Sequence, residues 1–195
     1  MTKIKKLSDI EAKKIAAGEV VERPINVVKE LIENSLDSGA EKITIYLEEG
    51  GKKLIRVVDD GCGMSPDDAL ICFDHHATSK ITKVEDLSSL QSFGFRGEAL
   101  SSISSVSNIE LITKEEASEA GTLVKMSGGK YVSQEEIATA DGTDISVKDL
   151  FFNLPARKKF LKKTETEWKQ IAHLFQALCL DRKSTRLNSS HQIIS

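Results

Sequence analysis

INVVKELIENSLDSGA, Ile25 to Ala40, is the stretch of sequence that decides the fold. Its apolar side chains recur every three or four residues, which predicts one amphipathic helix with a buried stripe. Pro24 stands just before it, where a missing N–H costs nothing, and Gly39 stands where a helix often ends in a left-handed residue. The predicted stripe consists of Val27, Val28, Leu31, Ile32 and Leu36.

The polar residues of this helix form a second pattern. Residues three and four apart are neighbours on a helix, so Glu30, Glu33, Asn34 and Asp37 are expected along one side. An acid and an amide one turn apart can take a proton from water and ligate a cation. The alternative is a solvated polar face with no chemical role, and the rest of the chain must decide between the two.

Size and composition predict an ordinary globular domain. The chain has 195 residues, of which 39% are hydrophobic and 29% charged, enough for one domain and part of a second. No apolar run approaches the roughly 18 residues that span a membrane, and the first residues lack the apolar core of a secretory signal. The three cysteines favour a reducing cytoplasm. The spacing of Cys62, Cys72, His75 and His76 matches no common zinc pattern.

The segment Asp181 to Ser195, DRKSTRLNSSHQIIS, differs from what precedes it. It is polar and serine-rich, and it resembles the translation of a short-read sequencing adapter. We therefore expect residues 1–180 to form a domain that is incomplete at its C-terminal end. Residues 181–195 are expected to be a non-native, disordered tail, and a natural disordered tail is the alternative.

Along the chain, helical and alternating patterns are mixed. Residues 74–97 have weak periodicity and predict a functional lid or a disordered segment. This order favours an α/β fold of the α+β two-layer type, in which helices cover one face of a mixed, largely antiparallel sheet. The expected helices are Leu7–Ala17, Ile25–Ala40, one opening at Ser65-Pro66, Glu98–Ser105, one after Pro155 and Thr164–Leu180, and the expected strands are Ile43–Leu47, Leu54–Val58, Ile109–Thr113, Thr122–Met126, Tyr131–Ile137 and Thr143–Val147.

Three glycine-marked sites are candidates for ligand binding. The P-loop pattern and the G-x-S-x-G hydrolase elbow are both absent from the sequence. Asp59-x-Gly61-x-Gly63 offers a carboxylate for a base amino group and glycines that let a flat ligand approach. Gly94 to Gly97 leads into a helix whose first N–H groups suit phosphates, and Thr143 follows Asp141-Gly142 at the start of a strand. For each site taken alone, a plain turn or loop is the alternative.

Taken in order, these motifs resemble the GHKL ATPase superfamily, which has the Bergerat ATP-binding fold. Within it, the chain is similar to the MutL family of DNA mismatch-repair proteins from Lys6 to about Leu180. The residues that carry the resemblance are IAAGEVVERP from Ile15, VVKELIENSLDSGA from Val27, DDGCGM from Asp59, HATSK from His76, GFRGEALSSISSV from Gly94 and NLPARKKFL from Asn153. The histidine-kinase, gyrase-like and heat-shock branches of the superfamily fit these runs less well.

The resemblance implies a role for each matching residue. Glu30 matches the general base for the attacking water, and Asn34 the amide that ligates Mg²⁺. Asp59 matches the carboxylate that recognises the adenine amino group, with Gly61 and Gly63 beside the base and Thr143 supporting the contact. The lid that wraps the triphosphate of ATP is matched by Thr78, Ser79, Lys80, Gly94, Phe95, Arg96 and Gly97.

The resemblance also implies how such a protein works. ATP orders the lid and the N-terminal segment, two ATPase domains dimerise, and hydrolysis releases them. The implied partners are a second copy, a MutS-like mismatch-recognition protein, DNA without sequence preference and a downstream repair nuclease or helicase, in a bacterial cytoplasm near the nucleoid. A basic segment, Arg157 to Lys163, is a candidate DNA-facing surface or a solvated helix face. Any endonuclease would lie outside this chain, and the alternative is a truncated nucleotide-binding module without useful turnover.

Overall fold

The computed structural model of the chain describes residues 20–74 and 98–181, and side chains as far as residue 178. The predicted helix Leu7–Ala17, the predicted lid and the tail after residue 181 lie outside the described residues. The described elements are α2 (Pro24–Asp37), β1 (Ile43–Glu48), η1 (Glu49–Gly51), β2 (Leu54–Asp59), α3 (Pro66–Ile71), α4 (Ala99–Ser105), β3 (Asn108–Lys114), β4 (Gly121–Ser127), β5 (Lys130–Ile137), β6 (Gly142–Lys148), α5 (Pro155–Phe160) and α6 (Thr164–Asp181).

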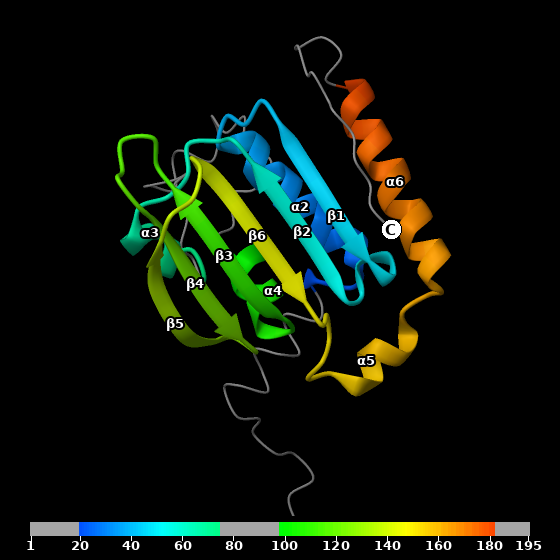
Figure 1. The fold of residues 1–195 in the computed structure, drawn as a ribbon. Coiled ribbons are helices and arrows are strands. Elements are labelled where there is room, and N and C mark those ends of the chain that lie inside the picture. Colours follow the sequence, from blue (N-terminus) through cyan, green and yellow to red (C-terminus); the bar gives the residue numbers. More distant parts are fainter. Residues whose placement is uncertain (1–19, 75–97, 182–195) are drawn as a thin grey trace, which may run out of the picture.

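A single sheet organises this part of the chain. Its strand order is β1-β2-β6-β3-β4-β5, and each of the five neighbouring pairs is antiparallel (Figure 1). β6 is the last strand in sequence but lies between β2 and β3, which sets the end of β2 beside the start of β6. The register pairs Asp59 with Thr143. The predicted two-layer α/β fold is confirmed.

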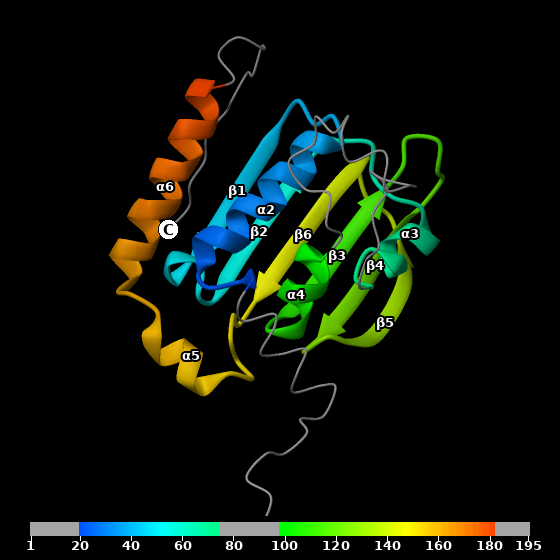
Figure 2. The ribbon, with the colours of Figure 1, turned by 180° about the vertical axis from the view of Figure 1, so that it is seen from behind.

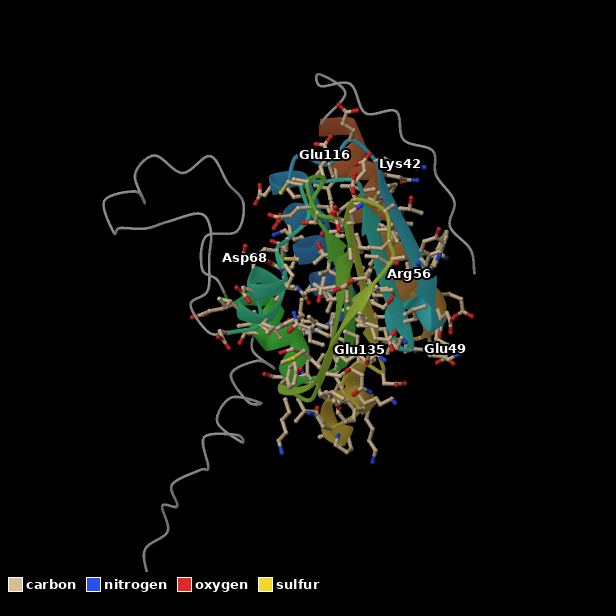
Figure 3. The ribbon with its side chains drawn as sticks, turned by 60° about the vertical axis from the view of Figure 1, so that its left-hand side comes forward. Lys42, Glu49, Arg56, Asp68, Glu116 and Glu135 are labelled. Carbon is tan, nitrogen blue, oxygen red and sulfur yellow. The ribbon has the colours of Figure 1, made fainter. Side chains whose placement is uncertain are left out.

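The two faces of the sheet differ. α2 and α4 lie across one face (Figure 2), and the strand residues that point to them are buried. These include Ile55 and Val57 on β2 and Leu111 on β3. Arg56 alternates with these residues and lies on the other side of the sheet from Asp68 of α3 (Figure 3). There it forms a two-bond ion pair with Asp144, at 2.9 and 2.6 Å.

The decisive helix forms as predicted but ends earlier. α2 begins at Pro24, and the backbone N–H of Arg23 donates to the Asn26 side chain at 2.9 Å. The last helical residue is Asp37 rather than Ala40, because Gly39 has a φ of +80° and reverses the chain. The N–H of Gly39 bonds the Leu36 carbonyl and that of Ala40 bonds the Ser35 carbonyl, which is the Schellman arrangement.

The remaining boundaries agree with the sequence patterns to within a residue or two. Ser65 caps α3 as expected, since its Oγ accepts the Asp68 N–H at 3.1 Å. α6 lies against α2 and η1. Its Glu167 is completely buried and pairs with Arg23 at 3.0 Å, so the start of α2 and the first turn of α6 are joined directly.

Candidate functional site

Asp59 is the centre of the site. It is the last residue of β2, only 9% exposed, and its side chain turns toward α2. The Ser35 hydroxyl donates to Oδ2 at 2.6 Å, and the Gly61 backbone N–H donates to Oδ1 at 3.0 Å. The Thr143 backbone N–H also donates to this carboxylate. A carboxylate has about four lone-pair positions, so these three bonds still leave acceptor capacity for one ligand N–H.

Burial and hydrogen bonding act on Asp59 in opposite directions. The pKa of its carboxyl group is raised above the ordinary value, chiefly because burial disfavours the charged form. The hydrogen bonds from Ser35, Gly61 and the Thr143 backbone favour the charged form, while the negative charge of Asp60 disfavours it. Asp60 has a separate structural role, because it accepts the backbone N–H groups of Glu41 and Lys42 at 2.9 and 2.8 Å.

The two glycines after β2, Gly61 and Gly63, let their loop pack closely against the end of α2 and against β3. A side chain at Gly61 would overlap the Ser38 hydroxyl at the end of α2. The Cys62 N–H bonds the Ser38 carbonyl at 3.0 Å, which holds the loop against that helix end. Gly63 has a φ of +68°, and a side chain there would overlap the Lys114 carbonyl. The sequence suggested glycines as room for a ligand, but close packing against α2 and β3 already requires Gly61 and Gly63.

Thr143 belongs to a cluster of hydroxyl groups beside Asp59. Its Oγ1 lies 3.2 Å from Oγ1 of Thr113, which is buried on β3. The Thr113 hydroxyl also donates to the Gly142 carbonyl and accepts the Met64 N–H, both at 3.0 Å. Thr113 thus joins the loop after β2 to the start of β6.

Glu30 and Asn34 lie one turn apart on α2, both half-buried, as the helical spacing requires. The predicted polar side is divided in the structure. Glu33 is 5% exposed and pairs with Lys29 at 3.1 Å, whereas Asp37 is exposed. The C-terminal half of α2, the end of β2 and the start of β6 lie at one end of the sheet (Figure 1). Asn34 belongs to that half of α2, so it shares this end with Asp59, and Glu30 lies one turn earlier on the helix.

The donor set fits a nucleotide with magnesium. A half-buried amide oxygen at Asn34 is a hard ligand, and Mg²⁺ in nucleotide sites takes one or two protein oxygens together with phosphates and water. Within residues 20–74 and 98–178, no three His, Cys, Asp or Glu side chains gather as a metal site.

The remaining predicted site residues cannot be placed relative to this end of the sheet. They are Thr78, Ser79, Lys80, Gly94, Phe95, Arg96 and Gly97, all outside the described residues. Across the described part of the chain, no helix is long and apolar enough to cross a membrane.

Sequence reasoning missed three residues of this site: Ser35, Ser38 and Thr113. Ser35 is adjacent to Asn34 and falls on the apolar side of α2, a position at which a polar residue needs a partner. That was the available signal. Ser38 and Thr113 gave none, because serine near a helix end and threonine in a strand are common for local reasons.

Known proteins resemble this chain in sequence and in fold. A family model for histidine kinase-, DNA gyrase B- and HSP90-like ATPases matches residues 22–151. The chain is 53% identical over 180 residues to the DNA mismatch repair protein MutL of Chloroherpeton thalassium, and 56% identical over 174 residues to that of Koribacter versatilis. These matches cover 92% and 89% of this chain but 28% and 27% of the two relatives, so the chain spans little more than a quarter of their length.

A solved structure gives the same picture. The ATPase domain of Aquifex aeolicus MutL, complexed with ADP, superposes with a TM-score of 0.71 at 34% identity. The superposition covers 89% of this chain and 61% of that one.

Proposed function

The chain belongs to the histidine kinase-, DNA gyrase B- and HSP90-like ATPase family, and on that premise we propose that it is the ATP-hydrolysing switch of a MutL-like DNA mismatch-repair protein. One observation carries the proposal. A buried carboxylate, Asp59, is oriented by donors from α2 and from its own loop, and α2 also carries Glu30 and Asn34. One helix thus serves both a base-recognition group and a pair of groups suited to hydrolysis.

The residues divide the work as follows. Asp59 accepts a hydrogen bond from the adenine amino group, and Thr143 supports this contact from the paired strand. Glu30 takes a proton from the attacking water, a role worth on the order of 10²–10⁴ in rate. Asn34 holds Mg²⁺, which offsets phosphate charge when bound. Thr78, Ser79, Lys80 and the segment Gly94 to Gly97 contact the phosphates.

The switch acts through assembly. We propose that ATP binding favours dimerisation of two copies, and that this couples a MutS-like mismatch-recognition protein to DNA and to a downstream nuclease or helicase. The setting is the bacterial cytoplasm near the nucleoid. The similarity to the N-terminal part of MutL proteins supports this proposal. We also propose that residues 1–180 are the ATPase domain and that residues 181–195 are non-native.

Glu30→Ala separates binding from turnover. We expect this variant to bind ATP with nearly unchanged affinity, measured by calorimetric titration with Mg²⁺, and to lose at least about a hundredfold in hydrolysis rate. Asn34→Ala is the matched variant one turn on, and it should lose Mg²⁺-dependent binding. Full hydrolysis by Glu30→Ala would overturn the assignment of the base.

A nucleotide-binding module without useful turnover is the second candidate function. It is favoured by the chain spanning 28% of its relative, since dimer contacts and further active-site groups can lie in the remainder. ATPase rate per molecule, measured against protein concentration for this chain and for a full-length relative, distinguishes the two. A rate that rises with concentration in both proteins supports the switch, and a rate that rises only in the longer protein supports the module.

A further inference from the structure

We propose that Ser35 is a positioning residue for base recognition: its hydroxyl holds the Asp59 carboxylate in the orientation that accepts an exocyclic amino group. This inference rests on the proposed function. It adds a residue that neither the sequence motifs nor the family roles assign, and it links the base contact to the helix that carries Asn34.

The geometry around Asp59 carries the proposal. Its two carboxylate oxygens are held from two different elements, Oδ2 by Ser35 on α2 at 2.6 Å and Oδ1 by the Gly61 N–H of the following loop at 3.0 Å. Two donors on opposite oxygens fix the rotation of the carboxylate plane. Ser35 is 3% exposed, so water does not compete for its single proton.

The Ser35 hydrogen bond also favours the ionised form of Asp59, against the larger effect of burial. A short bond from a hydroxyl to an ionised carboxylate is among the stronger hydrogen bonds in proteins, and it favours the ionised form that burial disfavours. An ionised Asp59 accepts from an amino group. A protonated Asp59 presents a hydroxyl that donates, and a donor facing a donor weakens recognition. Without Ser35, Asp59 keeps the bonds from Gly61 and Thr143 but loses the donor from α2, so its carboxylate is held less firmly and is more easily protonated.

Because Ser35 lies on α2, its bond to Asp59 also links the base contact to Asn34. Ser35 follows Asn34 directly, and successive residues on a helix point about 100° apart, so one turn presents Asn34 on one side and Ser35 toward Asp59. A shift of α2 along its axis would move both groups together. The base contact and the proposed magnesium ligand are therefore positioned by the same rigid segment.

The test compares two nucleotides that differ only in the amino group. ATP and purine riboside triphosphate, which lacks that group, are titrated with Mg²⁺ into the full chain and its variants. The native protein should prefer ATP, and Ser35→Ala should reduce the ratio of affinities by about fivefold to tenfold. Ser104→Ala is the matched control, because Ser104 is an equally buried serine whose hydroxyl bonds the Ser101 carbonyl inside α4. It should leave the ratio unchanged.

Each outcome is decisive. An unchanged ratio in folded Ser35→Ala overturns the positioning role, even if both affinities fall together, because a merely structural role weakens both nucleotides alike. If Ser35→Ala does not fold, Ser35→Cys replaces it, since a thiol has similar volume but is a weak donor. A native ratio in Ser35→Cys would then overturn the role. A native protein that binds neither nucleotide contradicts the proposed function instead.

Discussion

At the scale of single residues, Asp59 combines two opposing requirements. Recognition of an amino group needs an ionised acceptor shielded from water, and shielding an ionised carboxylate costs free energy. The structure meets both with a 9% exposed side chain that accepts bonds from Ser35 and Gly61. The pKa of Asp59 nevertheless stays raised, because burial is the largest influence on it.

The raised pKa of Asp59 gives two pH dependences of opposite sign. The folded protein binds this proton more tightly than the unfolded chain, so the contribution of Asp59 to the free energy of unfolding grows as pH falls through the raised pKa. ATP affinity should instead fall over the same range, because the added proton occupies an acceptor position of Asp59 and presents a donor to the amino group. Calorimetric titration with ATP and thermal unfolding, each measured against pH, check the two signs.

Two variants isolate this group. Asp59→Asn should remove both pH dependences of this group and weaken ATP binding by about tenfold to a hundredfold, the usual effect of losing a hydrogen bond to a charged group. At neutral pH it should be no less stable than the native protein. Asp60→Asn leaves the Asp59 carboxylate in place and removes the neighbouring negative charge that raises its pKa. The pH at which ATP affinity falls should therefore be lower in this variant than in the native protein. Native ATP affinity in Asp59→Asn would contradict the assignment.

The sequence predicts which side chains are available for chemistry but not what holds them. Asp59 and Thr143 were singled out in separate motifs, and the register of β2 with β6 brings them together. Ser35 and Thr113 escaped notice because their partners lie 24 and about 30 residues away. Local sequence patterns do not predict such long-range pairings, which become visible only once the topology is known.

At the scale of elements, the turn after α2 and the loop between β2 and α3 each contain a glycine with a positive φ, and the two glycines have different surroundings. Gly63 has a φ of +68° and faces the backbone of β3 at Lys114. Gly39, after α2, has a φ of +80° and open space around it. The sequence patterns predicted the strands here to within a residue and named Gly39 as the left-handed residue, but the expected helix ran to Ala40 and α2 ends at Asp37.

Comparing Gly63→Ala with Gly39→Ala separates the cost of a positive φ from the cost of a steric clash. Both variants incur the left-handed penalty of about 1–2 kcal/mol. Only Gly63→Ala also forces a methyl group into the Lys114 carbonyl, so its loss of stability should be larger, more than about 2 kcal/mol, and ATP affinity should fall with it. Chemical denaturation of the two variants gives the comparison. Equal losses would mean that the loop moves away from β3 at little cost.

At the scale of the whole molecule, an ion pair with a fully buried acid joins segments far apart in the chain. Glu167 of α6 is completely buried, pairs with Arg23 at 3.0 Å and accepts the Lys162 N–H at 2.9 Å. Gly50 of η1 packs so closely that a side chain there would lie 2.6 Å from the Thr164 carbonyl. The amphipathic pattern of α6 predicts the helix, but a charged residue in that pattern does not reveal a partner 144 positions earlier.

This pair should make α6 unfold together with the sheet. Removing one partner of a fully buried pair costs about 3–5 kcal/mol because the other charge is left uncompensated, and the 25% exposed Arg23 side chain places this pair below that range. Trp168, the only tryptophan, follows Glu167 and reports on α6, while far-ultraviolet circular dichroism reports on the whole molecule. We expect the two signals to change at the same denaturant concentration in the native protein, the mark of a single cooperative transition.

Arg23→Met tests this coupling. It should shift unfolding to lower denaturant, and the tryptophan signal should change before the dichroism, because α6 loses its buried contact with the start of α2. Glu167→Gln should have a smaller effect, since an amide oxygen can still accept the Lys162 N–H. The control is Lys53→Met, which breaks an exposed pair with Glu48 and should leave both signals coincident. If the two signals also stay coincident in Arg23→Met, the sheet and α6 are held together by their apolar contacts, and the ion pair adds stability without adding cooperativity.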